Sequence, residues 1–341
     1  MKALRDVVVT GQGWLLPPGM TPASFETPLA SDAGPAARQL HGFDAAAYVG
    51  DPKVLRAMNR VFQIAAAASV LAMRPAGFIA PADLERAGLV PERCGIATAM
   101  TEISPVDANL IDAIRDRSAG EKFDLGAFGE SARHRLHPFR RLMLLANMAA
   151  AHSSLLFGLQ GPSFTFNSGT SSGLQAIREA CWTIASGRAD LMLCEAADSP
   201  QNSLHCHPVT EAAAALVLEA EAVARRRGAR ILACLRPGPE QPCPSHPRVG
   251  EPSSEAAFCH HAPAAAGLLA VLARLPDGRA AAERQQPGSL RETAPGYPPE
   301  ASAAQARPAV LSSLEIVPCA PDPAALTGPS AALAAEKVGT R

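Results

Sequence analysis

The chain has 341 residues, of which 48% are hydrophobic, and these values predict a globular protein with a sizeable core. Lys and Arg total 31 against 32 Asp and Glu, so no basic excess favours nucleic acid or an anionic membrane surface as a partner. The N-terminus lacks the apolar region of a signal peptide, and the apolar stretches stop short of membrane-spanning length. We therefore expect a cytoplasmic protein without a membrane span.

Strands and helices alternate along the first 235 residues. The predicted strands are 6–13, 94–99, 162–167 and 189–195, and the predicted helices are 53–74, 139–157 and 171–186. Residues 211–219 suit a further strand, although their alanines also suit a helix. This alternation predicts an α/β protein with a mainly parallel sheet.

The composition changes near Arg236. Pro and Gly crowd residues 236–254 and 276–308, and only 264–275 has the pattern of a helix. Segments of this composition form linkers or stay disordered. We therefore expect an N-terminal half, 1–235, and a reduced, Pro/Ala-rich C-terminal half, 236–341, that is partly disordered.

The eight cysteines contain no CxxC pair. Several lie in apolar runs, as Cys194 does, which is typical of small buried hydrophobic residues rather than of a disulfide framework. Cys206 stands between His205 and His207, but the sequence supplies no second ligand pair at a spacing that suits zinc. We expect neither a metal nor a cofactor.

Several segments, in their order along the chain, resemble β-ketoacyl synthases of the thiolase superfamily. The resembling segments are 7–13, 43–48, 53–63, 92–96, 147–163 and the stretch through 187–193. The resemblance covers the chain from residue 5 to about residue 235. It implies an α/β, thiolase-like layered α-β-α-β-α fold, with a second half that is shortened in this chain.

The segment that carries the catalytic cysteine in that family is altered. The family places this cysteine on a sharp turn between a strand and a helix, where the helix N-terminus stabilises the thiolate. Here the turn reads FNSGTSSG over residues 166–173, and the cysteine position falls on Thr170. The nearest cysteine, Cys181, belongs to the following helix. The resemblance therefore implies that the nucleophile is missing.

The other catalytic groups of the family are also reduced. The His-Gly-Thr-Gly-Thr loop of the first catalytic histidine has no counterpart, whereas His261, before Ala-Ala-Gly, resembles the second histidine. Ala256 takes the place of the lysine expected five residues earlier, and Glu211 resembles the glutamate of the family's Gly-Glu-Gly-Ala segment. Thr170 and His261 are thus degenerate positions, and no catalytic residue is assigned.

These features predict a chain-length-factor-like subunit. Such a catalytically inactive relative pairs with an active ketosynthase in polyketide- or fatty-acid-type chain elongation, and shapes the pocket in which the acyl chain grows. The strand from Pro162 to Asn167 would pair across the pseudo-twofold axis of the heterodimer. The usual chain-length factors carry glutamine where this chain has Thr170. By itself the chain is not expected to be an enzyme.

Two other functions remain open. Thr170, or a neighbouring serine (Ser168, Ser171 or Ser172), could serve with His261 as nucleophile and base of an acyltransferase or thioester hydrolase. The simpler interpretation is that these hydroxyl groups cap the helix at 171–186. The chain could also be a stand-alone binding protein on a thiolase fold.

Residues 133–141 form a charged segment that includes His134, His137, Arg140 and Arg141. Such a run most simply faces water, but it could instead receive an acidic acyl-carrier protein. His152 is expected to be structural. The shortened second half is expected to leave its sheet incomplete, with apolar surface that a partner covers.

Overall fold

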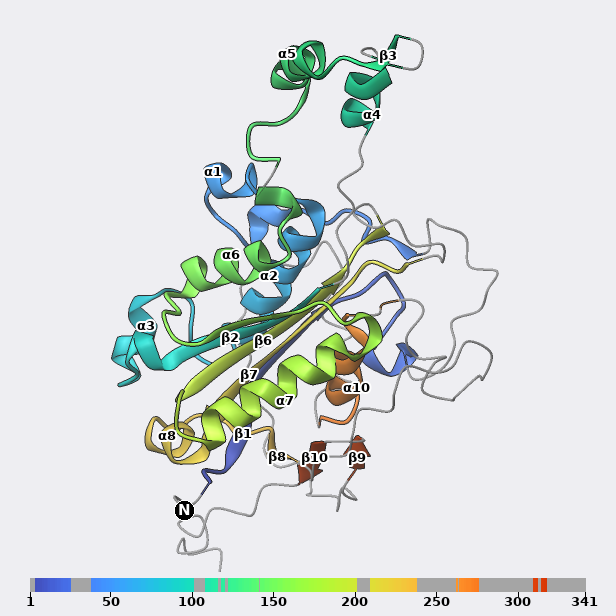
Figure 1. Cartoon of the computed structure of the whole chain (residues 1–341). Helices are drawn as coiled ribbons and strands as arrows, with labels where there is room; N and C mark the ends of the chain where they lie inside the picture. The colour runs from blue at the N-terminus through green and yellow to red at the C-terminus, as the bar shows by residue number, and fades with distance from the viewer. Residues whose placement is uncertain are drawn as a thin grey trace, which may run out of the picture.

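One eight-stranded sheet lies between two layers of helices (Figure 1). The computed structural model describes residues 4–25, 38–100, 108–115, 118–119, 122–140, 142–200, 209–237, 262, 264–275, 309–311 and 314–317. The strands of the sheet are β1 (Val7–Leu15), β2 (Cys94–Met100), β5 (Ser163–Phe166), β6 (Leu191–Asp198), β7 (Ala212–Ala220), β8 (Ala233–Pro237), β9 (Ala309–Leu311) and β10 (Leu314–Val317). Their order is β5-β2-β6-β7-β1-β8-β10-β9.

The helices are α1 (Pro52–Leu55), α2 (Arg60–Met73), α3 (Ala82–Arg86), α4 (Ala108–Arg115), α5 (Leu125–Arg135), α6 (Asn147–Phe157), α7 (Ser172–Ala185), α8 (Glu221–Arg226) and α10 (Ala266–Leu272). A two-stranded ribbon, β3 (Ser118–Ala119) and β4 (Lys122–Phe123), joins α4 to α5. Among the described residues, no helix combines the length and the apolar character that a membrane crossing requires.

The sheet is mixed, so the prediction of a mainly parallel sheet is wrong. Strands β5, β2 and β6 are parallel to one another, whereas β6–β7, β7–β1, β1–β8, β8–β10 and β10–β9 are antiparallel pairs. The helical crossovers that a parallel sheet requires lie between β2, β5 and β6, and antiparallel neighbours need none. Residues 211–219, which suited either structure, form the buried strand β7.

Two predicted helices are shorter in the structure. The helix expected at 53–74 is divided into α1 and α2, because Asn59 caps α2 by accepting a hydrogen bond from the amide of Phe62 at 2.9 Å. The helix expected at 139–157 begins only at Asn147, after a 3-10 turn at Leu142–Leu144. The strands at 162–167 and 189–195 and the helix at 171–186 are confirmed as β5, β6 and α7.

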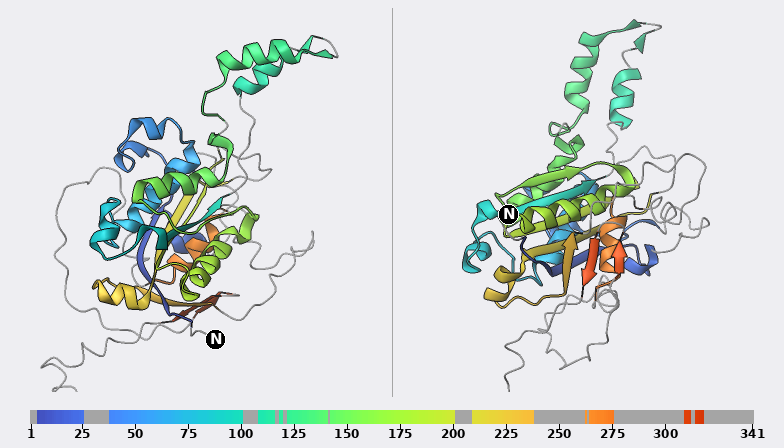
Figure 2. Two further views of the ribbon diagram at one scale, coloured as in Figure 1. Left: turned by 60° about the vertical axis from the view of Figure 1, so that its left-hand side comes forward. Right: turned by 60° about the horizontal axis from the view of Figure 1, so that its bottom comes forward.

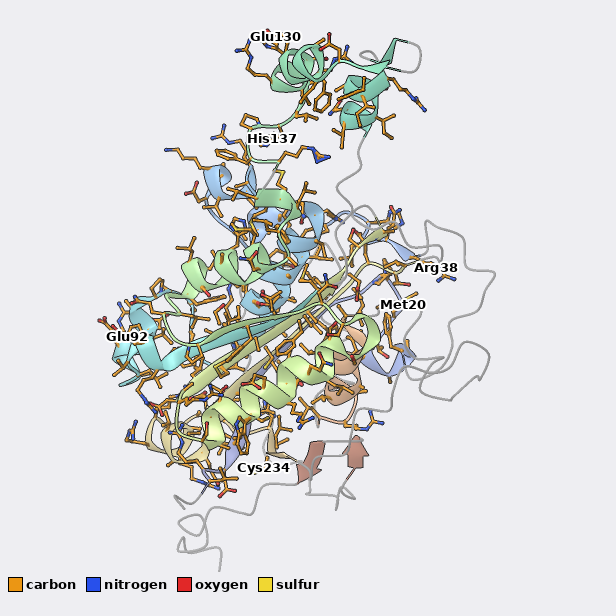
Figure 3. The ribbon with its side chains drawn as sticks, in the orientation of Figure 1. Met20, Arg38, Glu92, Glu130, His137 and Cys234 are labelled. Atoms are coloured by element: carbon orange, nitrogen blue, oxygen red, sulfur yellow. The ribbon has the colours of Figure 1, made fainter. Side chains whose placement is uncertain are left out.

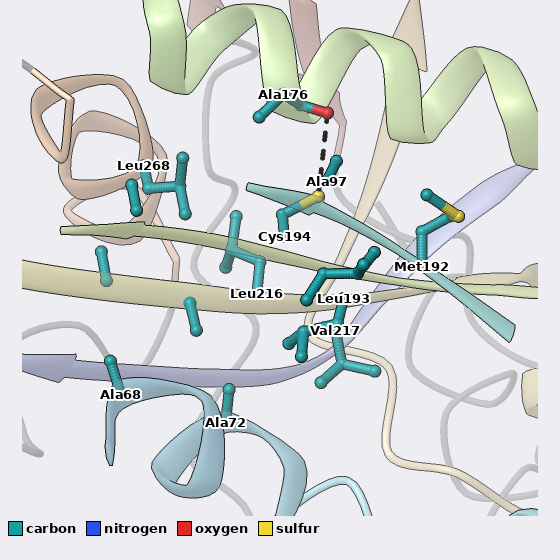
Figure 4. Close-up of a cluster of buried hydrophobic side chains, with 14 of the residues drawn as sticks. Ala68, Ala72, Ala97, Ala176, Met192, Leu193, Cys194, Leu216, Val217 and Leu268 are labelled. Carbon is teal, nitrogen blue, oxygen red and sulfur yellow. Dashed lines mark hydrogen bonds between the residues drawn. The ribbon is translucent and has the colours of Figure 1, made fainter. Parts of the chain in front are cut away.

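The core consists of small residues that allow helices to approach the sheet closely. Figure 4 shows Ala68 and Ala72 of α2 on one side of the sheet and Ala176 of α7 with Leu268 of α10 on the other. On β1, a Cβ atom added to Gly13 would stand 2.5 Å from the carbonyl oxygen of Ala68. The contact between α2 and β1 therefore depends on glycine in the strand.

The hairpin of α4 and α5 projects away from the sheet and its helical layers (Figure 2). Its two helices pack against each other, with Ala113 and Ser131 buried. Phe123 and Leu125 at its tip are 47% and 72% exposed. We call residues 108–140 the arm.

The described parts of the C-terminal region extend the layers formed by the first part. Strand β10 pairs with β8, β9 pairs with β10, and α10 packs against α7 and β7. The helix predicted at 264–275 is confirmed as α10. The division into halves at residues 235 and 236 stays a prediction.

The close contact of Gly13 with α2 predicts that alanine destabilises the protein at Gly13 but not at Gly50. Gly13→Ala should lower the free energy of unfolding by about 1–3 kcal/mol, because the methyl group has no space against α2. Gly50→Ala is the control, since a Cβ there meets no atom within 4 Å. Urea unfolding of both variants measures the difference, and equal stabilities would contradict the packing described here.

Candidate functional site at the turn between β5 and α7

The turn between β5 and α7 contains Thr170, where the resemblance implies that the nucleophilic cysteine is missing. β5 pairs with β2, with Thr165 opposite Thr98, and the chain then makes a 3-10 turn at Gly169–Ser171 before α7 begins. Gly169 has a φ of 61°, in the left-handed region that glycine occupies without strain. Thr170 lies inside this turn, and its side chain falls outside the described part of the structure.

Neighbouring serine hydroxyl groups are engaged within the turn itself. The amide of Ser168 donates to Ser172 Oγ at 2.7 Å, and Ser171 Oγ donates to the carbonyl of Ser168 at 3.1 Å. Gln175 Nε2 donates to Ser171 Oγ at 3.2 Å. The expected capping of α7 by Ser171 is wrong, because a 3-10 turn precedes the helix and Ser171 makes no side-chain cap bond.

The N-terminal ends of α7 and α10 touch beside this turn. A Cβ on Gly173 would stand 2.6 Å from the carbonyl oxygen of Ala264, and one on Gly267 would stand 2.6 Å from the amide of Leu174. Both helices therefore need glycine where they meet. The contact places the residues just before α10 near the turn, although His261 itself lies outside the described residues.

Asp198 fixes the start of α10. It is buried at the end of β6, and its carboxylate accepts hydrogen bonds from the amides of Ala264 and Ala265 at 3.2 and 2.8 Å. Sequence reasoning missed this residue. An acidic residue at the end of a buried strand was the available signal, but its partners lie more than sixty residues away along the chain.

Glu211, which the resemblance singled out, is a buried structural anchor. Its carboxylate accepts from Arg60 Nε at 2.9 Å and Nη2 at 3.0 Å, and from the amide of Leu40 at 2.8 Å. Ser199 Oγ donates to the same carboxylate at 3.1 Å. The Arg60 guanidinium also lies 4.7 Å from the centre of the Phe43 ring. Glu211 thus joins β7 to α2 and to residues 38–43.

Three buried cysteines of the sheet and of α7 are not suited to act as nucleophiles. Burial raises the pKa of Cys181, on α7, and of Cys94, on β2, to about 12. Burial also raises the pKa of Cys194, whose Sγ contacts the carbonyl of Ala176 (Figure 4). The reactive form of cysteine is the thiolate, which these three residues do not form near neutral pH.

His152, His134 and His137 lie on other elements than the turn. His152 is buried on α6, where burial lowers its pKa and its ring lies 6.0 Å from that of Phe62, as expected of a structural residue. His134 and His137 lie on the arm, where Figure 3 shows His137 and Glu130 far from the sheet. His134 Nε2 lies 3.5 Å from Glu130.

No group of three or more His, Cys, Asp or Glu residues is placed to hold a metal ion within the ranges that the structure describes. Cys206 and its two flanking histidines lie outside those ranges.

Alkylation of the native protein tests the cysteine assignment. Iodoacetamide at neutral pH should leave Cys94, Cys181 and Cys194 unmodified in the folded chain, because buried thiols with raised pKa values present no thiolate. All three should react after denaturation, and peptide mass spectrometry reports both results. Rapid native labelling of Cys181 would contradict this assignment.

Comparison with known proteins gives the family. The profile described as Beta-ketoacyl synthase, N-terminal domain, matches residues 20–217. A curated relative, the putative polyketide β-ketoacyl synthase 1 of Streptomyces halstedii, is 31% identical over 211 residues. The match covers 58% of this chain and 47% of the relative, so the chain spans about half the length of that protein.

Two solved structures share the fold. One is a type II polyketide synthase acyl-carrier protein in complex with its ketosynthase bound to the hexaketide, with a TM-score of 0.52 at 23% identity over 68% of this chain and 67% of that chain. The other is a β-ketoacyl synthase from Burkholderia phymatum STM815, with a TM-score of 0.50 at 25% identity over 68% of this chain and 63% of that chain.

The predicted thiolase-like α/β fold is therefore confirmed. The turn between β5 and α7 occupies the place that the resemblance gave to the catalytic cysteine turn, with Thr170 within it. Since the family profile matches more than half of its residues, this chain belongs to the β-ketoacyl synthase family of the thiolase superfamily.

Proposed function

We propose that this chain is a non-condensing β-ketoacyl-synthase subunit that pairs with an active ketosynthase in polyketide chain elongation. The observation that carries the proposal is the turn between β5 and α7, which has Thr170 where the condensing chemistry needs a thiolate. Cys181 is fully buried on α7 and cannot replace it. Condensation would then depend on the cysteine of the partner.

The edge of the sheet supports pairing with a partner. Strand β5 stands at one end of the strand order and pairs only with β2 within the described residues. Its residues from Phe164 to Phe166 are half-buried, and an open strand edge is a template for pairing with another chain. Leu155, on the helix that leads into β5, is 74% exposed. This is the strand that we predicted from Pro162 to Asn167 for the heterodimer.

The arm supports an acyl-carrier protein as a second partner. From residue 130 to residue 140 the described chain carries three arginines and two histidines against one acidic residue, Glu130, which pairs with Arg133 at 2.6 Å. Arg133 and His134 are 67% and 69% exposed on their side chains. A local basic surface on a chain of net charge −1 fits a small acidic protein.

An acyltransferase or thioester hydrolase has less support. Such an enzyme needs a base beside its hydroxyl nucleophile. In the described part of the chain, Ser171 and Ser172 hydrogen-bond only within the turn and to Gln175. Observation of an acyl-enzyme that forms on the chain and is lost in Thr170→Ala would favour that function instead.

Disruption of the β5 edge tests the pairing. Thr165→Lys should lower the yield of a complex with an intact β-ketoacyl synthase from the same genome at least tenfold, because a lysine on an edge strand opposes pairing with another strand. Leu4→Lys, at a site that is 57% exposed just before β1, which three strands separate from β5, is the matched control. Size-exclusion chromatography after co-expression measures both, and the absence of any complex with the unmodified chain would refute the pairing.

Charge reversal on the arm tests the carrier-protein surface. The double variant Arg133→Glu, Arg135→Glu should weaken binding of the acyl-carrier protein about tenfold or more at low salt, with less effect at high salt. Arg86→Glu, at a side chain that is 74% exposed on α3, is the control. Titration calorimetry with the assembled complex supplies the affinities, and equal affinities for all variants would exclude this surface.

A further inference from the structure

Glu195 is a fully buried acid with an unusual set of partners. It lies in β6, its side chain has no exposure, and its carboxyl group faces three hydroxyl groups. Ser69 Oγ and Ser153 Oγ each lie 2.6 Å from Oε2, and Thr98 Oγ1 lies 3.0 Å from Oε1. These partners come from α2, α6 and β2, so four elements meet at this carboxyl group.

The carboxyl group has no cation beside it in the described part of the chain. An ionised carboxylate that is buried without a countercharge is costly, whereas a protonated carboxyl group both donates and accepts hydrogen bonds. A serine that accepts the carboxyl proton can turn its own proton to a carbonyl of its helix. With one hydroxyl group turned in this way, the same three groups also satisfy the neutral acid, which burial favours.

Other titratable groups on the surrounding elements are engaged elsewhere. Arg60 of α2 binds Glu211, and Glu219 of β7 binds Arg227 and Thr10. His152 of α6 packs against Phe62. On the strands that flank the carboxyl group, Cys94 Sγ contacts the carbonyl of Val90, Cys194 Sγ contacts α7, and Asp198 caps α10.

We propose that Glu195 is a proton-operated latch, which holds α2 and α6 on the sheet while it is neutral and loosens α6 when it ionises. The consequence reaches β5, because α6 ends at Phe157 and leads into that strand within six residues. Loss of the proton would therefore weaken the edge that the proposed function assigns to the partner. This last step rests on the proposed function, and the latch itself does not.

The sign of the pH dependence follows from burial. Burial raises the pKa of Glu195, against the smaller opposite effects of Ser153, Ser69 and Thr98. Its contribution to stability is fully present below the pKa of an unfolded glutamate, and is lost as the pH rises through the higher folded-state pKa. Glutamine has nearly the same shape as glutamate and cannot ionise, so Glu195→Gln should abolish the loss of stability at high pH.

The test measures the isolated chain across pH. Hydrogen exchange of residues 147–157, corrected for intrinsic rates, should lose protection with rising pH in the unmodified chain and stay constant in Glu195→Gln. Glu221→Gln, at an acid paired with Arg225 on α8, is the control and should behave as the unmodified chain. Equal pH profiles for the unmodified chain and Glu195→Gln would overturn the latch.

A second variant keeps the proposal testable if Glu195→Gln does not fold. Ser69→Ala removes a donor that favours the ionised form and leaves the bond from Ser153 of α6, so the loss of protection should move to higher pH. An unchanged or lower midpoint would overturn the proposal. Complex formation with the ketosynthase is measured over the same pH range, to separate the two proposals. If exchange in α6 depends on pH as expected but no complex forms at any pH, only the partner role is refuted.

Discussion

The contact between Gly173 and Gly267 is the constraint on which the arrangement around Thr170 depends. Each glycine lies where any side chain would collide with the backbone of the opposite helix. Because the two helices touch there, α10 is held against the start of α7, beside the turn that contains Thr170. The packing of these two helices therefore sets the position of the turn relative to α10.

Buried polar groups maintain this arrangement from both ends of the sheet. Asp198 binds the first amides of α10, and Glu211 joins β7 to α2 and to residues 38–43. Both carboxylates find their donors within the fold, as buried acids must. At the opposite end, Asp190 bridges Arg5 and Arg93, and these arginines lower its pKa to about 2. These acids lie at strand ends, whereas Glu195 lies inside β6, and its printed partners are hydroxyl groups.

Local patterns were sufficient to predict the central elements, which are strands β1, β2, β5 and β6 and helices α2, α6, α7 and α10. The buried strands at 94–100 and 191–198 are mostly apolar runs, and the glycine after α6, Gly158, has the positive φ of a helix end. Asparagine is a common N-cap residue, so Asn59 indicated that a new helix begins within the predicted helix at 53–74. Strand direction is a non-local property, which is why the antiparallel pairs from β6 to β9 were not predicted.

The site could be predicted only in part for the same reason. The absence of cysteine from the turn is visible in residues 166–173, and the resemblance gave Thr170 its meaning. The hydrogen-bond partners of Asp198 and Glu195 lie 42 to 126 positions away along the chain, and no local sequence pattern predicts these contacts. A polar residue inside an apolar strand was the available signal for Glu195.

The most direct test of the account is a condensation assay with the assembled complex of this chain and an active ketosynthase, supplied with a malonyl-loaded acyl-carrier protein. The account predicts that replacement of the partner's catalytic cysteine by alanine abolishes condensation, whereas Thr170→Ala in this chain leaves the rate unchanged. Loss of condensation in Thr170→Ala, with the complex intact, would contradict it and make this chain an enzyme in its own right.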